Sequence, residues 1–197
     1  MVNKPLNRRS RKTKEDIYKA AIALFNEHGT AGVTMSDIAA KAKTSRSTVF
    51  NHYPSKTDLY DTFFWRFTEK ILEQTKARNL TGFRTTLYVF FEETGAEAEK
   101  YKRLLSDIAA LTVGNGDLAQ SEKEIDSQLL DFIAPLVEQG MLDCEVSGQM
   151  MVREVSAVLL GHITITNHEW LGGEQTTNLG DEHKKRFELL MNGLSPR

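Results

Sequence analysis

Short polar side chains recur at the helical spacing i, i+3, i+4 and i+7 in Thr44, Ser47, Thr48 and Asn51. One face of a helix would carry all four, and their hydroxyl and amide groups suit base edges and phosphates in a DNA major groove. Arg46 lies beside them, with the reach for a guanine or a phosphate. A solvated helix face would also be polar, but no Asp or Glu occurs between residues 46 and 53. The pattern favours nucleic-acid binding.

The charge distribution points to the same end of the chain. Residues 1–60 contain 11 Lys or Arg and 5 Asp or Glu, whereas the rest of the 197-residue chain contains 14 and 22. A formal net charge of −2 conceals this asymmetry. A basic end on an acidic body suggests an acidic partner, with nucleic acid first among the candidates, although a solvated basic tail is equally compatible with the charge.

Capping residues divide the N-terminal region into helices. Thr13 opens a capping-box pattern with Asp16, and Gly29 ends the helix that follows. Thr34 starts a second, short helix, and Ser45 a third that Pro54 stops. Ser55 starts a fourth helix, which we expect to reach about residue 76. Two short helices joined by a tight turn at residues 43–44 describe a helix-turn-helix.

The remainder of the chain keeps a helical period without strand-like alternation or an internal repeat. The expected helices lie near residues 82–94, 97–112, 120–139, 147–170 and 179–192. The fold class is therefore all-α, with nine helices. We expect a flexible basic arm over residues 1–12, a helix-turn-helix DNA-binding domain over residues 13–57, and a helical-bundle domain for ligand binding and dimerisation over residues 58–197.

The stretch TMSDIAAKAKTSRSTVFNHYPSKTDLY resembles the N-terminal DNA-binding domain of the TetR family of transcriptional regulators, and the resemblance covers residues 11–60. It implies a homodimer that binds a roughly palindromic double-stranded DNA operator, as a repressor that a small-molecule effector releases. By matching positions, it implies contacts to DNA from Thr34, Thr44, Arg46, Ser47, Thr48, Phe50, Asn51, His52 and Lys56. Lys43, a departure from the family pattern, would either add a contact to a phosphate or give the turn a different shape. The basic arm, with Arg8, Arg9, Arg11 and Lys12, would lie along the DNA backbone or in the minor groove.

This chain departs from the family pattern at two of these positions. Lys43 stands in the turn where family members usually have glycine, and a lysine adopts left-handed geometry only at a cost. Phe50 stands where the family often has tyrosine, so a hydroxyl contact to phosphate would be missing.

The last two expected helices are candidates for a dimer interface. Ala157 and Gly161 are small residues one turn apart in a helix that also carries Val158 and Ile165. The final helix carries an apolar stripe of Phe187, Leu190, Met191 and Leu194. Spacing does not separate an interface from an intrachain core, but the resemblance favours a four-helix dimer interface.

Aromatic residues are concentrated in the first helices of the C-terminal domain. Phe63, Phe64, Phe67, Tyr88 and Phe91 are the candidates for lining an apolar effector cavity, with Trp65 close enough to report binding by its fluorescence. Aromatic stripes at helical spacing also form ordinary cores. The next-to-last helix adds polar groups, including Asn167 and His168, which would line a cavity or make hydrogen bonds within an interface.

No catalytic motif for nucleotide binding, hydrolysis or metal chelation occurs, so we expect neither an enzyme nor a cofactor. Five histidines without a pair of cysteines make a structural metal improbable, and no apolar run is long enough to span a membrane. We expect a cytoplasmic protein with no membrane partner. Two alternatives remain open: an all-helical ligand-binding or enzymatic bundle with an incidental helix-turn-helix, and an adaptor without operator specificity.

Overall fold

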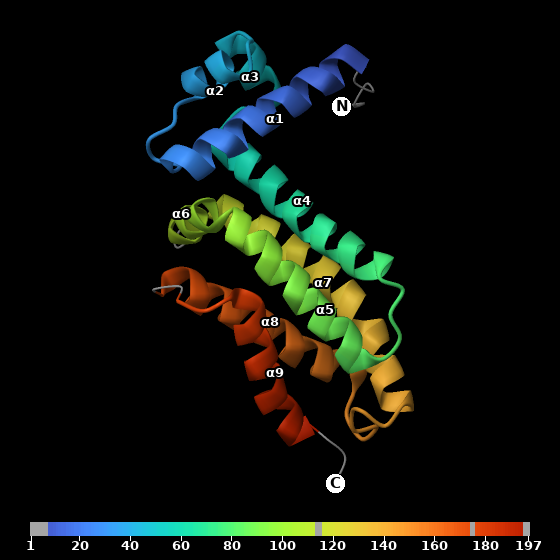
Figure 1. Cartoon of the computed structure of the whole chain (residues 1–197). Coiled ribbons are helices and arrows are strands. Elements are labelled where there is room, and N and C mark those ends of the chain that lie inside the picture. The colour runs from blue at the N-terminus through green and yellow to red at the C-terminus, as the bar shows by residue number, and fades with distance from the viewer. Residues whose placement is uncertain (1–7, 113–115, 174–175, 195–197) are drawn as a thin grey trace.

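The computed structural model describes residues 8–112, 116–173 and 176–194, and every regular element in those ranges is an α-helix (Figure 1). The nine helices of this described part are α1 (Arg8–His28), α2 (Met35–Lys41), α3 (Arg46–His52), α4 (Lys56–Ala77), α5 (Phe83–Lys100), α6 (Lys102–Thr112), α7 (Gly116–Leu142), α8 (Val152–Gly172) and α9 (Leu179–Leu194). The all-α prediction is confirmed. None of the helices in these ranges is long and apolar enough to cross a membrane.

Three of the four predicted N-terminal helix starts are confirmed by their hydrogen bonds. Thr34 and Ser55 form capping boxes with Asp37 and Asp58, in which hydroxyl and carboxylate each accept from the other residue's backbone N–H. The hydroxyl of Ser45 accepts from the backbone N–H of Thr48 at 3.1 Å. Each cap satisfies donors that the first helical turn leaves without a partner.

The predicted start at Thr13 is wrong. Helix α1 begins at Arg8, and the hydroxyl of Thr13 donates to the carbonyl of Arg9 at 3.0 Å, as a threonine inside a helix does. Arg8, Arg9, Arg11 and Lys12 are therefore helical, rather than part of a flexible arm. Residues 1–7 of the predicted arm lie outside the described residues.

The predicted break between residues 94 and 97 is also wrong, because α5 continues through Gly95 to Lys100. A Cβ atom at Gly95 would lie 2.6 Å from the backbone nitrogen of Gly180. The glycine therefore marks a close approach between α5 and the start of α9, rather than a helix end. The chain turns at Tyr101 instead, and α6 follows at once.

Helices α1–α3 form a small unit at one end of the molecule, and α4 runs from it along the larger body of α5–α9 (Figure 1). One hydrophobic core contains α1–α3 together with Leu104, Leu105 and Ile108 of α6. A second core lies among α4, α5, α7, α8 and α9. Helix α6 therefore completes the core of the N-terminal unit although it follows α5 in the chain.

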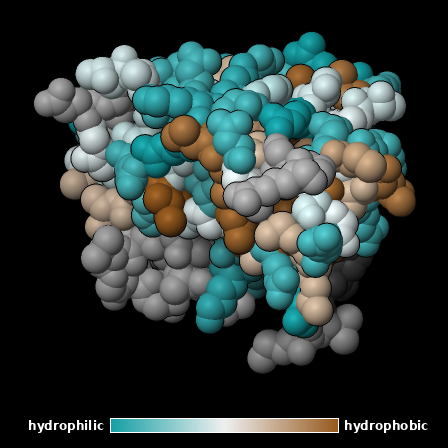
Figure 2. All heavy atoms as spheres, turned by 90° about the horizontal axis from the view of Figure 1, so that it is seen from below, coloured by the Kyte–Doolittle hydropathy of each residue, from teal (hydrophilic) through white to brown (hydrophobic). Residues whose placement is uncertain are grey.

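The end of the body away from α1–α3 has a mixed surface, on which hydrophobic side chains are interspersed with hydrophilic ones (Figure 2). The connection between α7 and α8 lies at this end (Figure 1), with Leu142 and Met151 exposed. Exposed apolar side chains on α8 and α9 are described with the candidate interface below.

Candidate DNA-binding surface and effector cavity

Helix α3 presents a polar face to solvent because its apolar side anchors it to α1 and α2. Val49 is fully buried and Tyr53 is 1% exposed. Arg46, Ser47, Phe50 and Asn51 are exposed, whereas Thr44, Thr48 and His52 are half-buried. The predicted stripe therefore lies on the outer side of a helix that is fixed from beneath, as readout of a major groove requires.

Hydroxyl groups at the start of α3 form a small network. The Oγ atom of Ser45 lies 2.9 Å from that of Ser47 and 2.7 Å from Oγ1 of Thr48. The guanidinium of Arg46 lies over the ring of Phe50, 5.3 Å from its centroid. This cation–π contact orients the Arg46 side chain along α3 toward Phe50, four residues later. Phe50 has no hydroxyl, so it makes no hydrogen bond to a phosphate as a tyrosine would.

The turn between α2 and α3 contains a lysine in the left-handed conformation. Lys43 has a φ of +53° and is exposed, and the backbone N–H of Thr44 donates to the carbonyl of Ala39 at 3.0 Å. The turn thus keeps a left-handed residue without the glycine that adopts this conformation most easily.

The remaining candidate DNA-contact residues differ in whether their side chains are exposed or already bonded within the chain. Arg8, Arg9, Arg11 and Lys12 have exposed or solvent-facing positions on the first turns of α1, and Thr34 is exposed at its cap. The ammonium of Lys56 donates to the carbonyl of Thr30 at 2.8 Å, within the chain. The ammonium group of Lys56 thus already stabilises the loop before α2. A DNA phosphate would accept from the N–H donors that this hydrogen bond leaves available.

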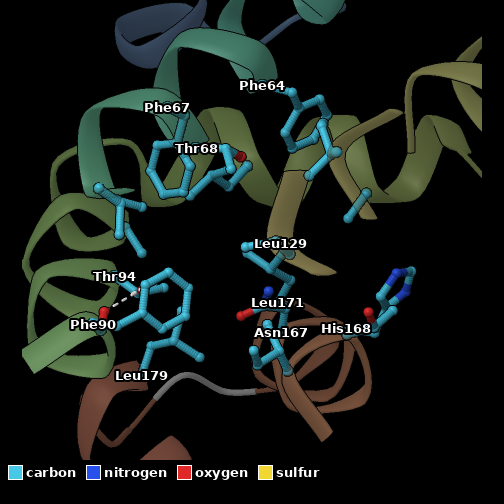
Figure 3. Close-up of a pocket in the computed structure, with 17 residues that line it drawn as sticks. Phe64, Phe67, Thr68, Phe90, Thr94, Leu129, Asn167, His168, Leu171 and Leu179 are labelled. Carbon is cyan, nitrogen blue, oxygen red and sulfur yellow. Dashed lines mark hydrogen bonds between the residues drawn. The ribbon is translucent and has the colours of Figure 1, made fainter. Parts of the chain in front are cut away.

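A cavity of about 160 Å³ lies in the larger body, enclosed by α4, α5, α6, α7, α8 and the first residue of α9 (Figure 3). Its lining is mostly apolar and includes Phe64, Phe67, Phe90, Leu129 and Ile163. Polar members are Thr68, Thr94, Thr164, Asn167 and His168. Among the described lining residues there is no Asp, Glu, Lys or Arg.

The structure brings only two of the five predicted effector residues to this cavity. Phe64 and Phe67 line it. Phe63 instead packs against Tyr101, with ring centroids 5.2 Å apart, in the core beneath α1–α3. Tyr88 and Phe91 face Phe187 in the other core, at 5.9 and 5.6 Å. Helical spacing identified the aromatic helices, but not which side of each helix faces the cavity.

Sequence reasoning also misplaced the fluorescent reporter. Trp65 is 44% exposed and is not among the described residues of the cavity wall. Trp170 is 6% exposed, beside the lining residue Leu171, and its indole N–H donates to the carbonyl of Thr177 at 2.7 Å. Trp170 is therefore the better reporter of a ligand. Asn167 and His168, the polar residues noted in the sequence, do line the cavity.

A buried polar chain leads from the cavity wall toward α9. Oδ1 of Asn167 lies 2.9 Å from Nε2 of His183, a fully buried residue that stacks on Phe91. His162 lies next to it, with ring centroids 5.4 Å apart. Burial lowers the pKa of His162 to about 4, with Arg186 adding to the effect. Burial also lowers the pKa of His183 to about 3, helped by His162 and Arg186. Both imidazoles are therefore neutral near pH 7.

Helix α6 links the cavity to the DNA-binding unit. Leu105 and Ala109 line the cavity. On the same helix, the carboxylate of Asp107 accepts from the backbone N–H of Thr30 at 2.6 Å, and Arg103 donates to the carbonyl of Glu27 at 2.7 Å. These two side chains hold the segment that leads from α1 into α2. No sequence motif marked this connection, because its partners lie 76 and 77 residues apart.

The predicted dimer residues divide between a surface and a core. Ala157, Val158 and Ile165 are exposed on α8, Gly161 is half-buried, and a Cβ atom at Gly161 would meet nothing within 4 Å. Phe187 and Met191 are fully buried in the core of this chain, so their assignment to an interface is wrong. Leu190 is half-buried, and the side chain of Leu194 lies outside the described residues. Leu189, which the sequence analysis passed over, is 68% exposed.

Both a family model and individual known proteins are similar to this chain. The family model for bacterial regulatory proteins of the tetR family matches residues 17–63. Over 193 residues the chain is 21% identical to the HTH-type transcriptional regulator AcrR of Shigella flexneri, covering 92% of this chain and 89% of that protein. It is 35% identical over 69 residues to a probable acrEF/envCD operon repressor of Escherichia coli, covering 35% of this chain and 28% of the relative.

Among solved structures, the chain is similar to Thermus thermophilus FadR, described as a TetR family transcriptional repressor in complex with lauroyl-CoA. The TM-score is 0.75 at 20% identity, and the match covers 93% of this chain and 96% of that one. The similarity therefore extends over both the N-terminal unit and the larger body. At this identity it concerns the fold.

The left-handed turn residue generates a stability prediction. Lys43→Gly should raise the free energy of unfolding by about 0.5–1 kcal/mol, because glycine removes the Cβ clash at positive φ. The gain is smaller than the full cost of the clash because glycine loses more backbone entropy on folding. Lys19→Gly, inside α1, is the matched control and should lower stability by about 1 kcal/mol. Urea denaturation measures both. A destabilised Lys43→Gly variant would contradict strain at this turn.

The buried histidines generate a pH prediction. Since their pKa values are lower in the folded state, the unfolded chain binds more protons below about pH 6.5, and stability should fall as the pH is lowered from there toward pH 4. For His183 the loss is about 1.4 kcal/mol per pH unit. Urea midpoints at pH 7.5 and 5.5 measure it, and His162→Phe should reduce the difference between them. An equal difference in both proteins would contradict the assignment to His162.

Proposed function

We propose that this chain, a member of the TetR family of bacterial regulatory proteins, represses transcription as a ligand-responsive homodimer on operator DNA. The observation that carries the proposal is an acid-free, outward-facing polar stripe on α3, connected through α4 and α6 to a largely apolar cavity. The chain acts as a regulator rather than an enzyme, in the cytoplasm, where operator DNA is found.

Readout of the operator rests on α3. Arg46, Ser47 and Asn51 are exposed and meet base edges, and Thr44 and Thr48 lie nearer the sugar-phosphate backbone at the helix start. Lys43 and the basic first turns of α1 lie beside the phosphates. Because the proposal rests on two recognition helices engaging half-sites about one DNA turn apart, dimer geometry sets operator affinity.

The dimer forms through the exposed side of α8 together with Leu189 of α9. Val158 is 46% exposed and Ile165 is 58% exposed, and they lie seven residues apart on the same helical face. Gly161 lies between them, with open space where its Cβ would be, so a second helix can approach closely. Large apolar side chains on an exposed helix face are typical of an interface.

Release from the operator follows from the position of the cavity. Phe64 and Phe67 come from α4, which begins beside the DNA-binding unit, and Leu105 comes from α6, whose Asp107 holds Thr30. A ligand that separates α4 from α6 therefore acts on both connections at once. Linkage requires that operator DNA weaken the binding of that ligand by the same factor.

The single experiment that tests operator readout is DNA binding by Arg46→Ala. If Arg46 contacts a guanine, the substitution should cost about 1–3 kcal/mol and relax the preference at one base pair. If it contacts a phosphate, affinity should fall evenly across sequences and the salt dependence should become shallower. A gel shift against DNA upstream of the gene measures both. Lys76→Ala, at the far end of α4, is the control and should bind as the unaltered protein does.

The dimer is tested by Ile165→Glu, which would place two carboxylates in the proposed interface. Sedimentation should report a smaller species, and operator affinity should collapse because a monomer engages one half-site. Leu142→Glu makes the same kind of change at a side chain that is 78% exposed outside the interface, and should leave the dimer intact. If Ile165→Glu stays dimeric, the interface lies elsewhere.

A further inference from the structure

The chemistry of the cavity wall restricts what can bind there. Thr94 is the polar residue whose hydroxyl is already used, since it donates to the carbonyl of Phe90 at 2.7 Å (Figure 3). His168 is the only ionisable side chain among the described lining residues, and it is exposed at the rim. A charged group placed in such a cavity would lose its hydration without gaining an opposite charge. The wall therefore selects against ions.

The side-chain amide of Asn167 is held in one orientation from behind. Its Oδ1 faces Nε2 of His183, which is neutral and fully buried, so that His183 donates its single N–H to this oxygen. The reverse orientation would leave a buried imidazole N–H without an acceptor, because Nδ1 of His183 has no hydrogen-bond partner. The Nδ2 group of Asn167 is therefore turned away from His183, and Figure 3 shows the amide reaching into the cavity.

The hydroxyl of Thr68 is a second polar group on the cavity wall. Thr68 is 8% exposed and lines the cavity, and no described residue forms a hydrogen bond with its hydroxyl. The hydroxyls of Thr75, Thr94 and Thr166, by contrast, donate to the carbonyl four residues earlier in their helices. Thr68 and Asn167 enter the cavity from opposite walls, α4 and α8 (Figure 3).

We propose that the cavity binds an uncharged, mostly apolar compound of one-ring size that carries a carbonyl oxygen, which accepts a hydrogen bond from Nδ2 of Asn167. The volume of about 160 Å³ sets the size, since an apolar cavity of about 150 Å³ admits a benzene molecule. Aryl ketones, aldehydes and esters have this chemistry. The inference specifies the effector class and rests on the proposed function for its regulatory meaning, but the binding itself does not require DNA.

His183 acts as a positioning residue in this proposal. It does not line the cavity, but its hydrogen bond fixes which end of the Asn167 amide the ligand meets. Without that bond the amide can present its oxygen to the ligand as readily as its Nδ2 group, so the preference for a hydrogen-bond acceptor over an apolar group becomes weaker. Phe91, stacked on the imidazole with centroids 5.1 Å apart, would stack on a phenyl ring at position 183 in the same way.

The test uses three probes of similar shape: acetophenone, ethylbenzene and benzoate. Binding to the DNA-free protein is measured at pH 7.5 by Trp170 fluorescence and by calorimetry. Acetophenone should bind about tenfold more tightly than ethylbenzene, as one hydrogen bond to a buried amide provides. Benzoate should bind more weakly than both. Benzoate binding as tightly as acetophenone, or equal binding of acetophenone and ethylbenzene, would overturn the proposal.

Variants assign the preference to named residues. Asn167→Leu is close to isosteric and should bring the acetophenone-to-ethylbenzene ratio to about one while ethylbenzene still binds, which shows that the cavity has kept its shape. His183→Phe should reduce the ratio although Asn167 is present. Asn192→Leu, at an exposed position of α9, should leave the ratio unchanged. An unchanged ratio in Asn167→Leu would contradict the assignment.

Operator binding in the presence of acetophenone separates this inference from the proposed function. Selective binding with the expected ratio but no effect on the operator complex would support the cavity chemistry and remove ligand-responsive repression by this class. No binding of acetophenone or ethylbenzene to a folded protein that still binds its operator would overturn the inference and leave the DNA-binding function standing.

Discussion

The attachment of α6 to the end of α1 is the interaction on which the rest of the structure depends. Leu104, Leu105 and Ile108 belong to the same hydrophobic core as α1–α3, and Asp107 fixes the backbone at Thr30. Helices α1–α3 form too small a unit to bury a large core of their own, and their core also contains side chains of α4 and α6. The N-terminal unit therefore shares its core with the larger body, and a shift of α6 would act directly on the segment between α1 and α2.

The polar groups inside the larger body are also arranged around a few interactions. Placing the fully buried His183 beside the half-buried His162 and Asn167 costs free energy, which the hydrogen bond between His183 and Asn167 and the stacking of His183 on Phe91 offset in part. A purely apolar arrangement would be more stable, but it would leave the cavity without a means of recognising one compound among many of similar size. Specificity in such a cavity comes from a single oriented amide, and its orientation comes from a residue outside the wall.

The sequence predicted what depends on neighbouring residues and missed what depends on distant ones. Thr34, Ser45 and Ser55 cap helices because their partners lie three residues away. A break was expected between residues 94 and 97, but Gly95 continues α5 and allows the close approach of Gly180, which lies 85 residues away in the chain. Phe187 and Met191 were also misassigned because their environment depends on residues far away in the chain. An apolar stripe fits an intrachain core or an interface equally well, and only the packing of α9 against α5 and α8 decides between them.

The geometry also explains how a compound of one-ring size could control a much larger operator complex. Helix α4 has 22 residues and is about 33 Å long, so a tilt of roughly 5° about one end moves the other by about 3 Å. Half-sites on DNA are held about 34 Å apart by the double helix and do not follow such a movement. Phe64 and Phe67 lie near the middle of α4, whereas Leu105 and Ala109 lie on α6. A ligand between them therefore acts both on α4 and on α6, the helix that holds the N-terminal unit. The displacement needed is smaller than the ligand, and therefore a small cavity is sufficient.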